Sequence, residues 1–261
     1  MPSVATDSTL FTPWQPGVWR CQLPRAAHVA AGITDRTGDI QTIRSLPLFS
    51  QGLVMADQVH GVSIASVDVS VTQIAGATTS TAPPEALVGG CDAMVTQTVG
   101  LGLAVRSADC LPLFVWDPIQ RVVGVAHAGW RGLAGQLPLH LVSFVQQRYH
   151  ARPEDLWVGI GPSIHACCYE VGSDFDARLT PWVQEQEGRR MCDLIACATT
   201  QLLEAGVRPG RVLESGVCTS CDPHRWFSLR REGEACGRLV SFIVMPSSPL
   251  RTSPDLSGLL V

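Results

Sequence analysis

The chain contains no lysine, because all 19 of its basic residues are arginine. This absence excludes a Schiff-base lysine, the phosphate-binding lysine of a Walker-type loop and a catalytic serine–lysine pair. Any anionic group of a substrate must therefore be bound by arginine, by backbone amides or by a metal ion. Arginine suits this task because its planar guanidinium can donate two parallel hydrogen bonds to a phosphate or a carboxylate.

Charge of either sign is scarce, since only 16% of the 261 residues are charged and the net charge is -4. Such a balance argues against a nucleic-acid-binding protein, which normally carries a basic face. No apolar run reaches the roughly 18–20 residues that span a bilayer, so we expect no membrane partner. The first residues show no basic segment followed by an apolar one, so we expect a cytoplasmic protein without an export signal.

The ten cysteines are therefore expected to be thiols or metal ligands rather than disulfides. One close-spaced group is compatible with a second, structural zinc site, namely Cys218, Cys221 and His224 with Cys236. Cys167 and Cys168 are adjacent in sequence and cannot easily bind one metal ion together. We expect those two to be buried thiols beside the pocket.

Short β-branched or alternating segments predict strands over 17–23, 28–33, 46–55, 62–69, 92–96, 101–106, 111–116 and 121–127. Further strands are predicted over 156–160, 211–214 and 238–244, with a cysteine-rich loop over 215–225. Helical periodicity predicts helices over 133–149, 174–187 and 190–205. Composition predicts a loop over 70–88 and loose ends over 1–16 and 247–261. Because strands and helices alternate irregularly, we expect one α+β domain over 1–261 with mixed sheets.

Three motifs place a metal-ligating side chain at or beside a predicted strand end: DQVHG (57–61), SADCLP (107–112) and AHAGWRG (126–132). Taken singly, a cysteine or histidine of this kind is most often a packed core residue. However, the turn signal Asp117-Pro118 predicts a hairpin that brings Cys110 and His127 to the same end of a sheet. With His60, this gives two nitrogens and one sulfur, typical of a catalytic zinc site with an open position. The same ligands also suit copper.

These motifs, with GCDAMVT (90–96), GIGPSIHACCYEVG (159–172) and CTSCDPHRWFSLRREGEACGR (218–238), resemble the laccase-domain family. This family is also called the polyphenol oxidase or peptidoglycan editing factor family. The matching segments run from about residue 46 to 245 in the family's order. The resemblance implies one zinc ion bound by His60, Cys110 and His127. It also implies an α+β fold in four αββα layers, with sheets packed together and helices outside.

The resemblance further implies a purine nucleoside enzyme, with nucleoside and phosphate as partners. The expected reactions are phosphorolysis of adenosine, inosine and methylthioadenosine, together with adenosine deamination. Zinc lowers the pKa of a water that it binds towards about 7, which would supply a nucleophile for C6 of adenine. Asp109 or Glu170 are the candidates for carrying the proton, beside Cys110 and His127.

Phosphorolysis also needs a phosphate site, for which Arg131 is the preferred candidate. It lies at a predicted helix start, where free backbone amides attract anions. A second cationic cluster is formed by Arg230, Arg231 and Arg238.

Three other functions stay open at this point. Cys110 could be a nucleophile activated by His127, in a hydrolase that trims a peptidoglycan precursor. The site could also hold a single copper ion in a polyphenol oxidase, although seven histidines are too few for a multicopper enzyme. Finally, the chain could be a zinc- or copper-binding module without activity.

Overall fold

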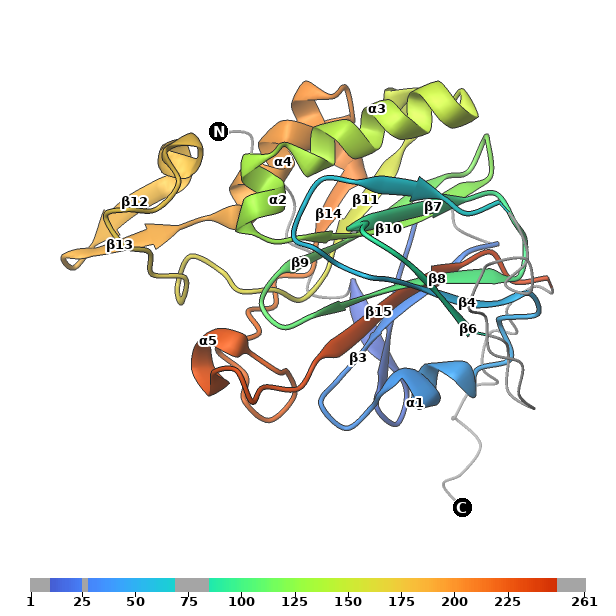
Figure 1. The fold of residues 1–261 in the computed structure, drawn as a ribbon, viewed down its shortest axis with the longest axis horizontal. Coiled ribbons are helices and arrows are strands. Elements are labelled where there is room, and N and C mark those ends of the chain that lie inside the picture. The colour runs from blue at the N-terminus through green and yellow to red at the C-terminus, as the bar shows by residue number, and fades with distance from the viewer. Residues whose placement is uncertain (1–9, 25–27, 69–84, 248–261) are drawn as a thin grey trace, which may run out of the picture.

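Two facing β-sheets form the centre of the protein, and helices cover their outer faces (Figure 1). The computed structural model describes residues 10–24, 28–68 and 85–247. The seven-stranded sheet contains, in spatial order, β1 (Phe11–Gln15), β2 (Val18–Cys21), β3 (Ala30–Thr34), β15 (Leu239–Val244), β8 (Leu101–Ser107), β4 (Gly52–Ala56) and β6 (Glu85–Val88). The six-stranded sheet contains β14 (Val212–Glu214), β11 (Trp157–Ile160), β9 (Leu111–Asp117), β10 (Val122–Ala128), β7 (Ala93–Thr96) and β5 (Ile64–Ser66).

The two sheets pack face to face through one apolar core. Because side chains alternate between the faces of a strand, Leu103 and Ile243 of one sheet meet Phe114 and Val123 of the other, and all four are fully buried. We propose that this shared core makes the two sheets parts of one domain.

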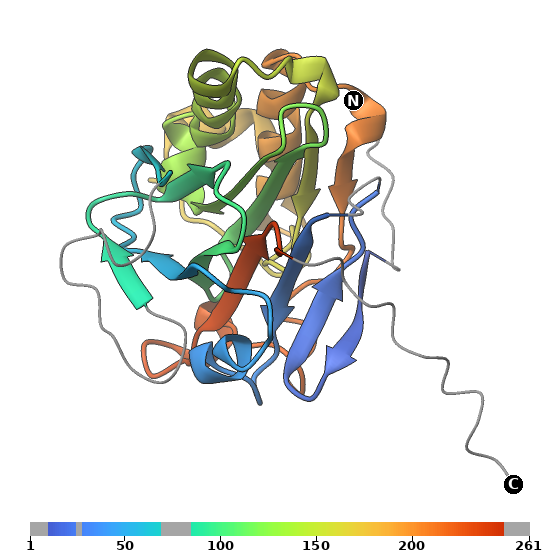
Figure 2. The ribbon, with the colours of Figure 1, turned by 90° about the vertical axis from the view of Figure 1, so that its right-hand side faces the viewer.

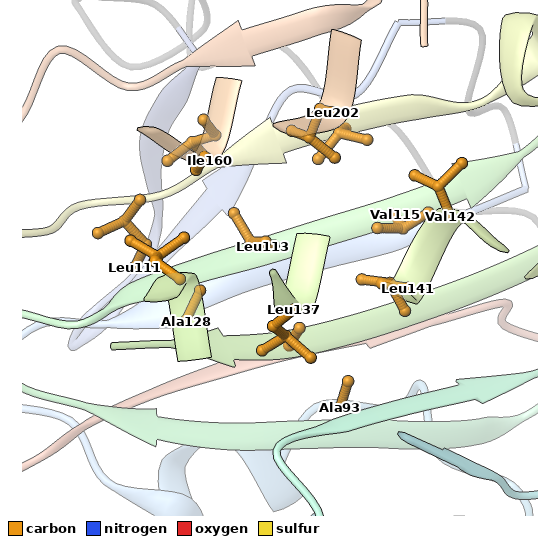
Figure 3. Packing of buried hydrophobic residues seen from close by; sticks show 14 of the residues in the cluster. Ala93, Leu111, Leu113, Val115, Ala128, Leu137, Leu141, Val142, Ile160 and Leu202 are labelled. Carbon is orange, nitrogen blue, oxygen red and sulfur yellow. The ribbon is translucent and has the colours of Figure 1, made fainter. Parts of the chain in front are cut away.

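Helices complete the layers on both sides (Figure 2). Apolar side chains of α3 (Leu137–Tyr149) and α4 (Leu194–Glu204) pack on the outer face of the six-stranded sheet, as the cluster in Figure 3 shows. On the opposite side, Ile43 of α1 (Ile40–Arg44) packs against the seven-stranded sheet. This arrangement confirms the expected α+β fold in αββα layers.

The predicted hairpin is confirmed, and both of its strands are buried in the six-stranded sheet. Strands β9 and β10 pair antiparallel, and His127 lies opposite Pro112 in the register. The carboxylate of Asp117 accepts hydrogen bonds from the backbone amides of Ile119 and Gln120, at 2.7 and 3.2 Å, which closes the turn. The hairpin thus fixes the position of its open end, where Cys110 directly precedes β9.

Several predicted elements are wrong in kind or in extent. The helix predicted over 133–149 is split into α2 (Trp130–Ala134) and α3, because Gln136 between them adopts a left-handed conformation with φ of 62°. The segment 174–187 forms a 3₁₀ helix (Ala177–Trp182) and β12 (Val183–Gln186). The segment 190–205 contains β13 (Arg189–Cys192) before α4 begins.

The remaining differences concern short elements. Strands predicted over 46–55 and 62–69 shrink to β4 and β5, and α5 (Leu229–Glu232) was not predicted. In the lead-in expected to be irregular, Phe11–Gln15 form β1. Most of the loop predicted over 70–88 and nearly all of the tail over 247–261 lie outside the described residues, but Glu85–Val88 form β6. Every helix in the described part of the chain is too short or too polar to span a lipid bilayer.

Candidate metal centre

The open end of the β9–β10 hairpin and the loop after β4 bring three metal-ligating side chains together. A nitrogen of His60, the sulfur of Cys110 and a nitrogen of His127 all lie within 4.8 Å of one another. The two imidazole rings stand nearly perpendicular, at 87°, with their centroids 4.8 Å apart. Three donors at such spacing fit one metal ion, and two nitrogens with one sulfur suit zinc with its fourth position open.

One buried carboxylate, Asp92, orients both histidines. Its Oδ1 lies 3.0 Å from Nδ1 of His127, which leaves Nε2 of that ring available for a metal ion. It also accepts hydrogen bonds from the backbone amides of His60 and Gly61, at 3.0 and 2.6 Å. A carboxylate behind a ligating histidine fixes the ring and its tautomer. The sequence motif GCDAMVT contained Asp92, but sequence reasoning gave it no role.

The backbone around the three ligands is tightly constrained. His60 and Asp109 adopt φ angles of 60° and 86°, in the left-handed region that few residues with side chains adopt. A Cβ atom at Gly129 would lie 2.9 Å from the Cys110 sulfur and 3.6 Å from Cδ2 of His60. The glycine in HAGWRG is therefore needed because the chain passes directly over the ligand atoms.

The electrostatics couple the Cys110 thiol to the His127 imidazole. Burial raises the pKa of Cys110, but hydrogen bonds to His127 and His60 and their positive charges lower it to about 7. Burial lowers the pKa of His127, but its contacts with Asp92 and Cys110 raise it to about 9. In the metal-free pair these interactions favour the thiolate and the imidazolium. A thiolate is the form that binds metals and the form that attacks electrophiles.

A cleft of about 450 Å³ opens over the three ligands. That volume suits a small molecule. Besides these three residues it is lined by apolar side chains and by five polar ones: Asp57, Gln58, Arg106, Ser107 and Arg238. Of these, sequence reasoning had selected only Arg238. Asp57 belongs to the DQVHG motif, and Arg106 directly precedes the SADCLP motif. The positions of these two motifs could therefore have drawn attention to both residues.

The other arginines selected from the sequence lie outside the lining of this cleft. Arg131 is exposed, and its guanidinium stacks over the Trp130 ring with 4.4 Å to the centroid. Arg230 donates a 2.8 Å hydrogen bond to the carbonyl of Glu170. Arg231 donates to the carbonyls of Thr219, Ser220 and Trp226, at 2.8, 2.9 and 2.6 Å. Arg231 therefore stabilises the loop that contains Thr219 and Ser220.

The two predicted proton carriers also lie outside the cleft lining. Asp109 is buried, and its carboxylate accepts hydrogen bonds from the Thr219 hydroxyl, the Ser228 hydroxyl and the Arg230 amide, at 2.7, 3.1 and 2.7 Å. Asp109 thereby ties the strand end next to Cys110 to α5. Glu170 is exposed to solvent. Asp57 is the carboxylate that lines the cleft with the ligands.

This chain is similar to known proteins in both sequence and fold. A family model described as multi-copper polyphenol oxidoreductase laccase matches residues 33–246. The purine nucleoside phosphorylase YlmD of Geobacillus stearothermophilus is 37% identical over 264 residues, which cover 87% of this chain and 94% of that protein. The adenosine deaminase RL5, from an unknown prokaryotic organism, is 31% identical over 200 residues, which cover 73% and 74%. The crystal structure of YlmD from Geobacillus stearothermophilus superimposes with a TM-score of 0.76 at 29% identity, covering 91% of this chain and 99% of that one.

Proposed function

Since the chain belongs to the multi-copper polyphenol oxidoreductase laccase family, we propose that it is a zinc-dependent purine nucleoside enzyme. The proposed reactions are phosphorolysis of adenosine, inosine and methylthioadenosine, and deamination of adenosine. Relatives named purine nucleoside phosphorylase and adenosine deaminase support this substrate class. The observation that carries the proposal is the convergence of His60, Cys110 and His127 in a cleft of small-molecule size.

The residues at the cleft fit a zinc ion. His60, Cys110 and His127 would hold it, and Asp92 would keep the His127 ring in the orientation that offers Nε2. Zinc at this place would supply a Lewis acid and a bound water of lowered pKa. Asp57 lines the same cleft and is the carboxylate that we assign to proton transfer in place of Asp109 and Glu170.

Arg238 and Arg106 provide the positive charge for phosphate, because both line the cleft. The backbone of Arg106 is fixed by Gln58, whose side chain exchanges two hydrogen bonds with it, at 2.6 and 2.7 Å. The terminal nitrogen of Arg238 donates to the carbonyl of Cys236 at 2.6 Å, which orients the guanidinium. Because the chain has no lysine, these two arginines are the permanently cationic side chains in the cleft lining.

A metal-free hydrolase is the second candidate, and one observation favours it. The pKa of Cys110 is lowered to about 7 next to His127, which is the arrangement of an activated cysteine nucleophile. Such an enzyme would use Cys110 to attack a carbonyl of a peptidoglycan precursor. A copper polyphenol oxidase would use the same three ligands, because a site of two histidines and one cysteine also suits copper.

Incubating the zinc-loaded protein with adenosine, with and without phosphate, tests the proposed reactions. We expect adenine and ribose 1-phosphate only when phosphate is present, and ammonia in both cases, with inosine accumulating without phosphate and passing on to hypoxanthine when phosphate is present. Chromatography of the bases and an ammonia assay distinguish the two products. If the zinc-loaded protein converts adenosine in neither condition, the proposed function is wrong.

Replacing the cleft arginines tests where phosphate binds. We expect Arg238→Ala and Arg106→Ala each to raise the KM for phosphate roughly tenfold to a hundredfold, because a lost charged hydrogen bond costs about 1.5–3 kcal/mol. The exposed Arg189, which pairs with Glu187 on the β12–β13 hairpin, provides the control variant Arg189→Ala. The Arg131→Ala variant tests whether phosphate binds in the cleft or at the start of α2. A rise in KM with Arg131→Ala alone would place the phosphate at that helix.

A further inference from the structure

A second cluster of thiols lies outside the cleft. It consists of two adjacent cysteines in the turn after β11 and two in the loop after β14, namely Cys167, Cys168, Cys218 and Cys221. All four sulfur atoms lie within 4.8 Å of one another. Within the part of the chain that the structure describes, this cluster and the three ligands of the cleft are the two groups of side chains that could hold a metal ion.

The backbone brings these thiols together. Strands β11 and β14 pair in parallel, and the pairing continues beyond their ends through a bridge between Ser163 and Cys218. There the Thr219 amide donates to the Ser163 carbonyl at 2.9 Å. Each segment then turns, and the amide of Cys221 donates to the carbonyl of Cys218 at 3.3 Å. Because main-chain hydrogen bonds set the positions, the convergence does not depend on the thiols alone.

The sulfur–sulfur distances fit one tetrahedral metal ion. The sulfur of Cys221 lies 3.6 Å from that of Cys167 and 3.5 Å from that of Cys168, and the latter two lie 3.8 Å apart. Four thiolates bound at about 2.3 Å around a tetrahedral zinc ion stand about 3.8 Å apart. A disulfide would need about 2.05 Å. These three distances are therefore close to those of a four-thiolate zinc site, and the Cys218 sulfur lies within 4.8 Å of the other three.

We propose that these four cysteines bind a structural zinc ion, separate from the metal centre in the cleft. Zinc suits the site because four cysteine thiolates are one of the ligand sets of closed structural zinc sites. The proposal does not depend on the function of the cleft. It changes two expectations from the sequence: His224 and Cys236 lie outside the cluster, and Cys167 and Cys168 are not buried thiols but contribute two adjacent ligands.

The zinc ion would anchor a loop that reaches the cleft. Thr219 lies between two of the cysteines, and its hydroxyl donates to Asp109, next to the ligand Cys110. The carbonyls of Thr219 and Ser220 also accept hydrogen bonds from Arg231. Holding the loop at the four thiols therefore holds the strand end that carries Cys110.

Zinc content measured by elemental mass spectrometry on the full chain, purified with zinc present, tests the proposal. We expect two zinc ions per chain in the unmodified protein. The double variant Cys218→Ser/Cys221→Ser should lose one of them, and so should Cys167→Ser/Cys168→Ser. Cys236→Ser provides the control, because its cysteine lies outside the cluster, and it should keep both. His60→Ala should lose the other ion, since its ligand belongs to the cleft.

X-ray absorption at the zinc edge gives a second readout on His60→Ala, which retains only the proposed ion. We expect a shell of four sulfur atoms at about 2.3 Å and no nitrogen shell. Zinc content unchanged in both cysteine double variants would overturn the proposal. It would equally be overturned by iron instead of zinc at the site, or by a disulfide among the four cysteines in the freshly purified protein.

Discussion

Alanine at any of the three cleft ligands is expected to remove the metal ion from the cleft and to stop nucleoside turnover. We expect His60→Ala, Cys110→Ala and His127→Ala each to lower kcat/KM by about 10³-fold or more. The reason is that a metal ion contributes several kcal/mol of transition-state stabilisation, and about 1.4 kcal/mol corresponds to a factor of ten. Two remaining ligands bind zinc too weakly to retain it through purification.

Zinc content and steady-state kinetics on the same samples check this result. The control is His140→Ala, which removes an exposed histidine on α3. Circular dichroism shows whether each variant is folded. A folded Cys110→Ala protein that keeps its zinc content and its activity would contradict the ligand assignment.

Asp92→Asn is expected to weaken zinc binding in the cleft roughly 10–100-fold without unfolding the protein. The asparagine side chain has nearly the same volume as the aspartate side chain. It has only one oxygen to accept the hydrogen bonds that two carboxylate oxygens accept in the unmodified protein. Those bonds come from the ring of His127 and from the amides of Val59, His60 and Gly61. Both histidines therefore lose part of their orientation through one change.

Competition with a chelator of known affinity measures the dissociation constant of the Asp92→Asn variant. Asp117→Asn is the matched control, because that carboxylate is also buried and also accepts backbone hydrogen bonds, but in the turn of the β9–β10 hairpin. An unchanged zinc affinity in Asp92→Asn, with a normal affinity in the control, would show that the histidines are oriented by other contacts.

Local signals in the sequence were sufficient for the hairpin but not for the segment over 174–187. In the hairpin, Asp117-Pro118 and two apolar runs point to the same structure. In 174–187, helical spacing of apolar residues is overridden by a turn at Glu187 and Gly188, which adopt φ angles of 52° and 76°. Two consecutive positive φ angles favour a tight hairpin turn, so the segment ends in β12 instead of a helix.

The convergence of His60, Cys110 and His127 could be predicted because the hairpin signal and the three motifs together point to one place, although each residue taken singly is most often a packed core residue. Their partners could not. Asp92 is an ordinary carboxylate in sequence, and only the fold places it behind His127. Arg231 and Arg238 belong to the same sequence motif, and nothing in that motif distinguishes their roles. In the structure, the Arg231 guanidinium donates hydrogen bonds to three backbone carbonyls, whereas Arg238 lines the cleft. Long-range contacts of this kind leave no local pattern.

Alkylation of Cys110 with and without prior chelation tests the metal centre most directly, because both candidate mechanisms use this cysteine. Mass spectrometry maps each labelled cysteine, so the thiols of the second cluster are counted separately. A metal-bound thiolate reacts slowly, whereas a free one next to His127 reacts fast. We expect Cys110 to be protected in the zinc-loaded protein, and chelation to expose it and to stop adenosine conversion. Full turnover in a verified zinc-free sample, with rapid labelling of Cys110, would contradict the account and favour a cysteine nucleophile.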